Sequence, residues 1–129
     1  MQTDTLLKLA ADSARAAYAP YSNFHVGAAL LSEDGEVFTG CNVENASYGL
    51  TICAERTAVF NAVSQGKRRF LAIAIASPDA CPPCGACRQV LNEFQPDMII
   101  YLGDENGKLI HETRLAKLLP DAFGPENLG

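Results

Sequence analysis

The stretch FLAIAIAS, from Phe70 to Ser77, contains only apolar and small residues and carries no charge. A continuous apolar run of this kind is typical of a strand that is buried on both faces of a parallel sheet. Because both faces of such a strand are covered, a helix is expected on each side of the sheet. The stretch therefore predicts a domain of the α/β class.

The sequence on either side of this strand predicts the rest of the sheet. A helix over 84–94 and a second apolar strand over 98–102 would complete a strand, helix, strand crossover. Upstream, 24–31 and 36–42 resemble strands, and the Asp34-Gly35 step between them favours a tight antiparallel hairpin.

Four further elements complete the expected order. They are helices over 4–18, 52–65 and 114–119 and a short strand over 109–111. Thr3 or Asp4 is expected to cap the first helix, and Gly66 to close the second. The tail after Pro120 is expected to be irregular. The order α-β-β-α-β-α-β-β-α implies a three-layer α/β/α sandwich around a mixed sheet of about five strands.

Size and composition indicate a single folded unit. The chain has 129 residues, of which 48% are hydrophobic and 19% charged, and it shows no linker, internal repeat or low-complexity stretch. A chain of this length can bury a core without disulfides. We therefore expect one domain over residues 1–129.

The charge pattern argues against a nucleic-acid partner and against a membrane. The net charge is −5, and the basic cluster Lys67-Arg68-Arg69 is interpreted as a solvated turn, whereas a phosphate backbone requires an extended positive face. Met1 is followed by polar residues, and the longest apolar run, 71–76, is too short to span a bilayer. We expect a cytoplasmic protein.

The cysteines are the strongest indication of chemistry. Five cysteines in a chain of this type favour reduced thiols over a disulfide framework. Cys53-Ala54-Glu55 opens one expected helix, and Pro83-Cys84-Gly85-Ala86-Cys87 opens the next. Successive helices can begin at the same end of the sheet, and Cys84 and Cys87 share one helical face. Three thiolates are therefore expected to converge.

Three convergent thiolates at helix N-termini suit zinc. The helix ends lower thiol pKa values, and three protein ligands leave a fourth position open for water, as in catalytic zinc sites. Zinc acidifies that water, and Glu55 is placed to take its proton and deliver it to a leaving group. Arg56 is the candidate that compensates the negative charge of the thiolates.

Two residues at the end of an expected strand suggest a sugar site. Asn42 and Glu44 alternate along the chain, so both side chains can point to one side. An amide beside a carboxylate can hold a sugar hydroxyl as donor and acceptor. Glu44 would repel a phosphate, which favours a nucleoside over a nucleotide.

Cys-x-Glu followed by Pro-Cys-x-x-Cys is the signature of zinc deaminases that act on nucleobases. With Phe24, the segment 42–49, CAERTA at 53–58 and PCGACRQ at 83–89, the chain resembles the small free-nucleoside cytidine deaminases over essentially its whole length. The resemblance implies hydrolytic deamination of cytidine and deoxycytidine to uridine and deoxyuridine in pyrimidine salvage. It also implies one Zn²⁺ per subunit on Cys53, Cys84 and Cys87, with Glu55 as proton shuttle.

The resemblance also implies the substrate contacts. Asn42 and Glu44 would bind the ribose 3′-hydroxyl, and Phe24 would pack on the pyrimidine; Ala54 belongs to the same pocket. The small cytidine deaminases are homotetramers, in which residues matching Ala46, Tyr48 and Phe123 reach into a neighbouring subunit's pocket. A homotetramer with shared active sites is therefore expected.

Alternatives remain open at this stage. Cys81-Pro82-Pro83-Cys84 is itself a redox-type C-x-x-C, or Cys81 could close a structural zinc site as its fourth ligand. A deaminase of this kind could also act on another aminopyrimidine or a cytosine-bearing antibiotic. On spacing alone, an ordinary structural role is a second alternative for three of the candidates: Phe24 in the core, Glu44 in a loop and Arg56 on the surface. Cys41 is interpreted as a small buried hydrophobe, and His25 and His111 as surface or satisfied strand positions rather than metal ligands.

Overall fold

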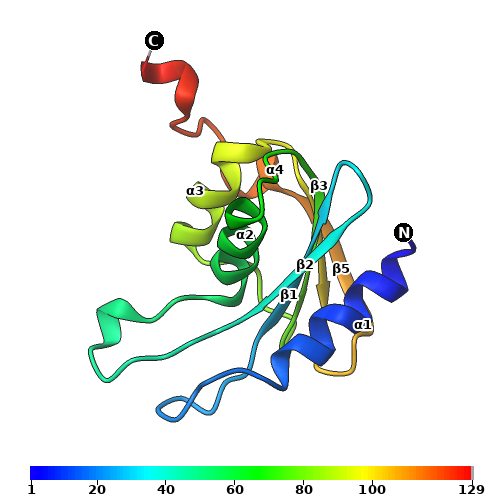
Figure 1. Cartoon of the computed structure of the whole chain (residues 1–129), viewed down its shortest axis with the longest axis vertical. Coiled ribbons are helices and arrows are strands. Elements are labelled where there is room, and N and C mark those ends of the chain that lie inside the picture. Colours follow the sequence, from blue (N-terminus) through cyan, green and yellow to red (C-terminus); the bar gives the residue numbers. More distant parts are fainter. Residues whose placement is uncertain (129) are drawn as a thin grey trace.

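A computed structural model describes residues 1–128 and is built around one mixed sheet of five strands (Figure 1). The strands lie in the order β2-β1-β3-β4-β5, and only β3 and β4 run parallel as neighbours. Their bounds are β1 Gly27–Ser32, β2 Val37–Cys41, β3 Phe70–Ala76, β4 Ile99–Gly103 and β5 Leu109–Arg114. The predicted α/β fold with a five-stranded mixed sheet is confirmed.

The central strand β3 is covered on both faces, as its apolar run predicted. Ile73 and Ile75 point into one core cluster, whereas Ala72 and Ala74 belong to the cluster on the opposite face. This split follows from the alternation of side chains along a strand. The alanine face leaves room for a helix that lies close to the sheet.

That close helix is α1 (Thr3–Ala14), which covers the alanine face alone in Figure 1. Leu6, Leu7 and Ala10 are buried beneath it. A Cβ atom at Gly27 would lie only 1.9 Å from the carbonyl oxygen of Ala10, so β1 and the helix backbone are nearly in contact there. A side chain at position 27 is therefore excluded.

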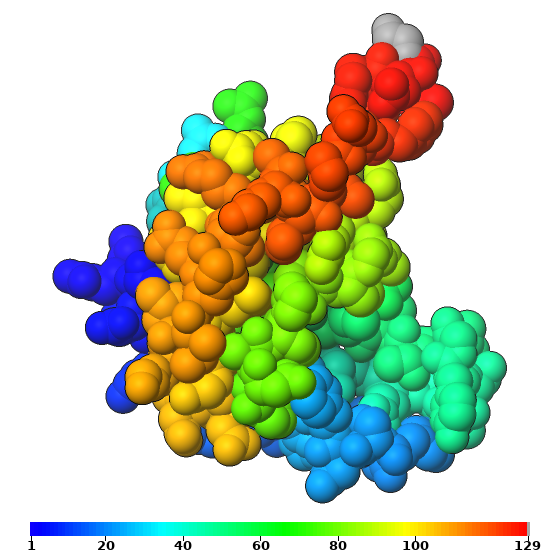
Figure 2. Space-filling view, turned by 180° about the vertical axis from the view of Figure 1, so that it is seen from behind, coloured from blue at the N-terminus to red at the C-terminus, as the bar shows by residue number. Residues whose placement is uncertain are grey.

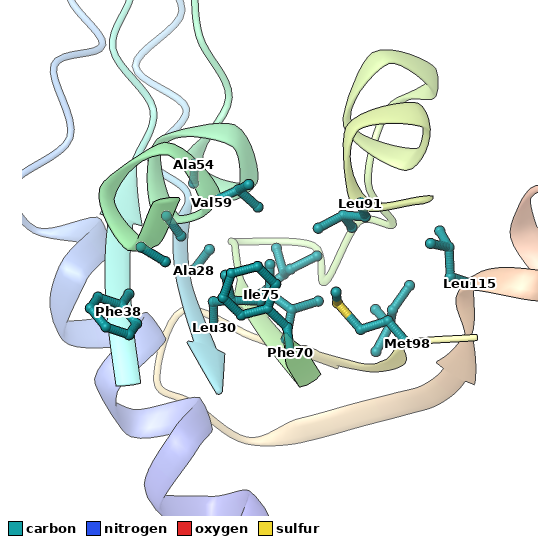
Figure 3. Packing of buried hydrophobic residues seen from close by; sticks show 14 of the residues in the cluster. Ala28, Leu30, Phe38, Ala54, Val59, Phe70, Ile75, Leu91, Met98 and Leu115 are labelled. Carbon is teal, nitrogen blue, oxygen red and sulfur yellow. The ribbon is translucent and has the colours of Figure 1, made fainter. Parts of the chain in front are cut away.

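The opposite face carries the helices α2 (Ala54–Ser64), α3 (Gly85–Phe94) and the short α4 (Leu115–Leu118). Their apolar side chains, including Val59 and Leu91, pack on Leu30 and Ile75 of the sheet (Figure 3). Gly40 lets α2 approach β2, because a Cβ atom there would lie 2.4 Å from the amide nitrogen of Ala58. The three layers predicted from the sequence are thus complete.

The first helix differs from its predicted bounds. Its N-cap is Gln2 rather than Thr3 or Asp4, and it ends at Ala14 instead of continuing to Tyr18. The backbone of Tyr18 pairs with the segment after β2, donating to the carbonyl of Asn42 at 3.0 Å and accepting from the amide of Glu44 at 2.8 Å. Tertiary pairing has therefore replaced the last helical turn.

Smaller differences occur elsewhere. The strand expected from Phe24 begins only at Gly27, and β5 runs on to Arg114, beyond the expected end at His111. A short 3₁₀ helix forms at Tyr48–Leu50. A second one, at Pro125–Leu128, lies within the tail that was expected to be irregular. The hairpin turn at Gly35, with φ of 91°, is as predicted. Within residues 1–128, none of the helices has both the length and the apolar character needed to cross a bilayer.

Candidate active site and metal centre

The topology of the sheet explains why two helices begin side by side. β2 is antiparallel to β1, and β1 is antiparallel to β3, so β2 and β3 run in the same direction. The chain leaves the carboxyl end of β2 toward α2 and the carboxyl end of β3 toward α3. Their N-caps are Cys53 and Cys84, so both cysteines stand at one edge of the sheet.

The structure brings the three predicted thiols together. The sulfur atoms of Cys53, Cys84 and Cys87 all lie within 4.8 Å of one another, and Cys53 Sγ is 3.7 Å from Cys84 Sγ. That distance is far longer than a disulfide bond of about 2.05 Å. It matches the spacing of about 3.8 Å between two sulfurs that bind zinc tetrahedrally at about 2.3 Å each. The cluster therefore fits zinc.

Arg56 lies against this cluster. One of its guanidinium nitrogens, Nη2, is 3.5 Å from Cys53 Sγ. Hydrogen bonding from Cys87, followed by the contact with Arg56, lowers the pKa of Cys53 to about 5. The same bond to Cys53, together with burial, raises the pKa of Cys87. These contacts favour the thiolate form of Cys53, next to the cation that stabilises it.

Glu55 is the buried acid of the site. It lies in the first turn of α2 and is only 5% exposed. Burial raises the pKa of its carboxyl to about 7, far above the ordinary value for glutamate. A carboxyl with a pKa near neutrality can both accept and donate a proton, which is the requirement for acid–base catalysis.

A cavity of about 410 Å³ connects this acid with the candidate substrate residues. Phe24, Asn42, Glu44 and Ala54 line it together with Glu55, Cys53 and Cys84. Cys87 lies behind them and is fully buried. The structure thus brings two of the three thiols, the acid and the sugar-binding candidates together at one cavity.

Asn42 and Glu44 are already hydrogen-bonded to the segment that precedes β1. Asn42 Oδ1 accepts from the amide of Val26 at 2.9 Å, and its Nδ2 donates to the carbonyl of Phe24 at 2.8 Å. Glu44 Oε1 accepts from the amides of Tyr21 at 2.9 Å and Ser22 at 3.2 Å. Both side chains thus hold a loop in addition to facing the cavity.

Four cavity residues were absent from the sequence prediction: Ser22, Val26, Thr51 and Pro82. Val26 and Pro82 carry no chemical signal that a sequence pattern would detect. Ser22 stands two residues before Phe24, a spacing at which a serine hydroxyl often bonds a backbone amide. That spacing was the available signal for Ser22.

The remaining thiols and histidines stay outside the cluster. Cys81 lines the cavity, but its sulfur is not among the three that converge, and its neighbour at 3.5 Å is the hydroxyl of Ser77. Cys41 is half-buried at the end of β2 rather than fully buried. His25 is partly exposed and His111 is exposed on β5.

The residues expected to serve a neighbouring subunit do not line this cavity. Ala46 and Tyr48 are exposed, Tyr48 to 75%, and Tyr48 lines an adjoining hollow with Tyr21 that shares Ser22, Glu44 and Thr51 with the cavity. Phe123 is 58% exposed. In Figures 1 and 2 the segment after Pro120 projects from the end of the molecule opposite the loops near residues 20 and 45.

The domain has three α/β/α layers, and two adjacent helix starts bring three thiols and a buried carboxyl together. This combination defines a metalloenzyme of the zinc deaminase type. Residues 1–103 match the family model of the cytidine and deoxycytidylate deaminase zinc-binding region. The chain belongs to the cytidine deaminase family.

Relatives with known names and structures agree with this family. The chain is 54% identical to a cytidine deaminase of Sporosarcina psychrophila, covering 94% of this chain and 93% of the relative. It is 51% identical to that of Halalkalibacterium halodurans, covering 99% and 98%. The crystal structure of cytidine deaminase from Burkholderia pseudomallei superposes with a TM-score of 0.88 at 50% identity, covering 95% of this chain and 100% of that one.

Proposed function

We propose that the protein is a zinc-dependent aminohydrolase that converts cytidine and deoxycytidine to uridine and deoxyuridine, with release of ammonia. The observation that carries this proposal is the buried carboxyl of Glu55 beside the three converging thiols, in a cavity that Asn42 and Glu44 also line. The named relatives, which are cytidine deaminases, support the same reaction.

Cys53, Cys84 and Cys87 are the proposed ligands of one zinc ion per chain, since their sulfur atoms have the spacing that zinc requires. When bound, zinc supplies the Lewis acidity that makes a water molecule nucleophilic at neutral pH. Arg56, at 3.5 Å from Cys53 Sγ, offsets the negative charge that three thiolates bring to a half-buried site.

Glu55 is the proposed proton shuttle. Its carboxylate takes a proton from the attacking water and donates it to N3 of the base, while the water oxygen bonds to C4. It then carries the second proton of the water to the exocyclic amine, the bond from C4 to nitrogen breaks, and ammonia leaves. The apolar surroundings that bury Glu55 keep its protonated and charged forms close in free energy, as this relay requires.

The same cavity is proposed to hold the nucleoside. Phe24 would pack on the pyrimidine above Ala54, and Asn42 and Glu44 would bind the 3′-hydroxyl of the sugar. The carboxylate of Glu44 disfavours a phosphorylated sugar. This sugar site argues against a free aminopyrimidine as the substrate. A closed structural zinc site is disfavoured for a different reason, because the sulfur of Cys81 lies outside the thiol cluster and would have to be the fourth ligand.

Assembly completes the proposal. Tyr48 and Phe123 are large, exposed aromatic residues, and the segment after Pro120, which α3 holds at the backbone of Phe123, projects from the body of the chain beyond that point. We infer a homotetramer in which Ala46, Tyr48 and Phe123 of one chain reach a neighbour's pocket. One domain over residues 1–129, a place in pyrimidine salvage and a cytoplasmic location remain predictions from the sequence.

A direct assay tests the reaction. The zinc-loaded protein should release ammonia from cytidine and deoxycytidine, lose this activity with a strong chelator and regain it with added zinc. Free cytosine, which lacks the sugar, is the matched substrate control and should react poorly. Turnover of cytosine as fast as cytidine would contradict the sugar site, and activity that survives complete zinc removal would contradict the metalloenzyme.

A further inference from the structure

The hydroxyl of Ser22 lies between two residues that the proposed function assigns to the substrate. Ser22 Oγ donates to Glu44 Oε2 and accepts a hydrogen bond of 3.0 Å from the backbone amide of Phe24. A single hydroxyl therefore connects the carboxylate proposed to bind the sugar with the residue proposed to face the base.

The segment around Ser22 is held by both candidate sugar-binding residues. Glu44 accepts the backbone amides of Tyr21 and Ser22 on its other oxygen. The side-chain amide of Asn42 donates a hydrogen bond to the carbonyl of Phe24. The peptide groups on either side of the Phe24 Cα are thus held, one by Ser22 and the other by Asn42, and this fixes the backbone position from which the ring projects.

Counting hydrogen-bonding capacity shows what is left for a ligand. A carboxylate has about four acceptor positions, and three of those on Glu44 are filled by Tyr21 and Ser22. The amide nitrogen of Asn42 has two hydrogens, one of which goes to Phe24. One acceptor on Glu44 and one donor on Asn42 remain, which is the complement of a single hydroxyl group.

We propose that Ser22 is a positioning residue that links the carboxylate of Glu44 to the ring of Phe24, so that sugar and base are recognised by one preorganised unit. This inference rests on the proposed substrate roles of Glu44 and Phe24. With Ser22 in place, Glu44 presents its last acceptor position in a fixed direction, and the ring of Phe24 is already set when the nucleoside enters. Without the hydroxyl, the carboxylate and the loop must be ordered at the expense of binding.

The consequence is a change in substrate binding rather than in chemistry. Ser22 is exposed and belongs to no helix or strand, so its replacement leaves the core intact. Ser22→Ala removes both hydrogen bonds of the hydroxyl and should raise the KM for cytidine about threefold to tenfold, with kcat unchanged. Ser22→Thr keeps the hydroxyl and should have a KM close to that of the wild type. Ser22→Val has nearly the shape of the threonine variant but no hydroxyl, and its KM should be raised as in Ser22→Ala.

A double-mutant cycle tests the link itself. KM and kcat for cytidine are measured for Ser22→Ala, Phe24→Ala and the double variant, with zinc content and thermal unfolding recorded for each. If Ser22 links the two residues, its replacement should raise KM by a clearly smaller factor in the Phe24→Ala background than in the wild-type background, with the remaining effect arising from Glu44. Ser64→Ala, an exposed serine that bonds a backbone carbonyl at the end of α2, is the matched control and should match wild type.

The outcomes distinguish the positioning role of Ser22 from the proposed contact between Phe24 and the base. If Phe24→Ala raises KM and Ser22→Ala does not, or if the two effects multiply independently, the positioning role is overturned and the base contact stands. If Phe24→Ala itself leaves KM unchanged, the proposed base contact fails and the role of Ser22 falls with it. A Ser22→Val variant that binds cytidine as well as Ser22→Thr would also overturn the proposal.

Discussion

At the scale of single residues, the site depends on a carboxyl group that water scarcely reaches. Glu55 is 5% exposed, and its burial raises its pKa to about 7. An amide of the same shape would occupy the position but could not carry a proton. The side chain can therefore be tested for chemistry separately from packing.

Glu55→Gln should keep zinc and bind cytidine while kcat falls about 100- to 10,000-fold, the range of a positioned acid–base group. The measurements are zinc content, equilibrium binding of cytidine and steady-state turnover. Turnover within a few-fold of wild type would remove Glu55 from the proton relay. Loss of zinc together with activity would show instead that the carboxyl supports the metal site.

The thiols permit a similarly clean separation. Cys53→Ala, Cys84→Ala and Cys87→Ala should each lose bound zinc, because removing one of three ligands leaves too few to hold the ion tightly. Cys41→Ala and Cys81→Ala are matched controls that should retain one zinc per chain by elemental analysis. Zinc loss in Cys81→Ala would place a fourth sulfur in the ligand set.

At the scale of the elements, the position of α2 determines where Cys53 and Glu55 lie. A Cβ atom at Gly40 of β2 would lie 2.4 Å from the amide of Ala58 and 2.8 Å from the carbonyl of Ala54. Neither backbone atom can move without the helix. Any side chain at position 40 must therefore push the first turn of α2 away from the sheet.

Gly40→Ala should destabilise the fold by about 1–3 kcal/mol and should also lower zinc occupancy and kcat/KM, because the displaced turn carries the site. Thermal unfolding and zinc content are the measurements. Gly49→Ala, at a glycine with open space around it, is the control for both. A Gly40→Ala protein with wild-type unfolding temperature and full zinc would show that α2 is not held by this contact.

The elements also show what the sequence could and could not predict. The apolar run of β3, the Asp-Gly turn and the cysteines at two helix starts led to the observed layers, because each is a local pattern with a local cause. The end of α1 was wrong because Tyr18 pairs with residues on both sides of Val43, a contact far away along the chain. The true start of β1 was missed for a similar reason. The amide and the carbonyl of Phe24 are hydrogen-bonded to the side chains of Ser22 and Asn42, so they do not pair with a neighbouring strand.

The candidate site follows the same division. Its thiols and Glu55 stand in short motifs that the sequence makes visible: the structure brings the three sulfur atoms together, and Glu55 lines the same cavity as Cys53 and Cys84. Ser22 and Thr51 line the cavity only because loops far apart along the chain meet, and no periodicity marks such a meeting. The extent of β5 was underestimated because most of its residues are exposed and it is defined by pairing with β4.

At the scale of the whole molecule, the segment 121–128 is anchored to α3 at Phe123. Gln89 and Asn92 of α3 both donate to the carbonyl of Phe123, at 2.8 and 3.2 Å. The segment then projects away from the cavity loops of its own chain (Figure 1). Its direction is therefore set by α3, while its aromatic side chain has no place in its own pocket.

Subunit complementation tests the shared site. Chains carrying Glu55→Gln are mixed with chains carrying Tyr48→Ala and Phe123→Ala, and subunits are allowed to exchange. Some hybrid pockets would combine an intact Glu55 with intact aromatic residues from the neighbour, so activity should reappear above that of either parent.

Sedimentation provides the accompanying control. The wild-type chain should sediment as a tetramer, and Phe123→Ala should weaken assembly and raise KM without loss of zinc. A fully active monomer, or absence of recovery despite demonstrated exchange of subunits, would contradict the shared site and leave the deaminase assignment in place.

The separation of the proposed metal ligands along the chain has a thermodynamic consequence. Cys53 and Cys84 are 31 positions apart and come together only because β3 and two helix starts are in place. An unfolded chain offers no such triad, so the ion binds almost exclusively to the native state. By mass action, each tenfold rise in free zinc above the dissociation constant adds about 1.4 kcal/mol to the free energy of unfolding. The conformational stability of this protein is therefore a function of the metal supply around it.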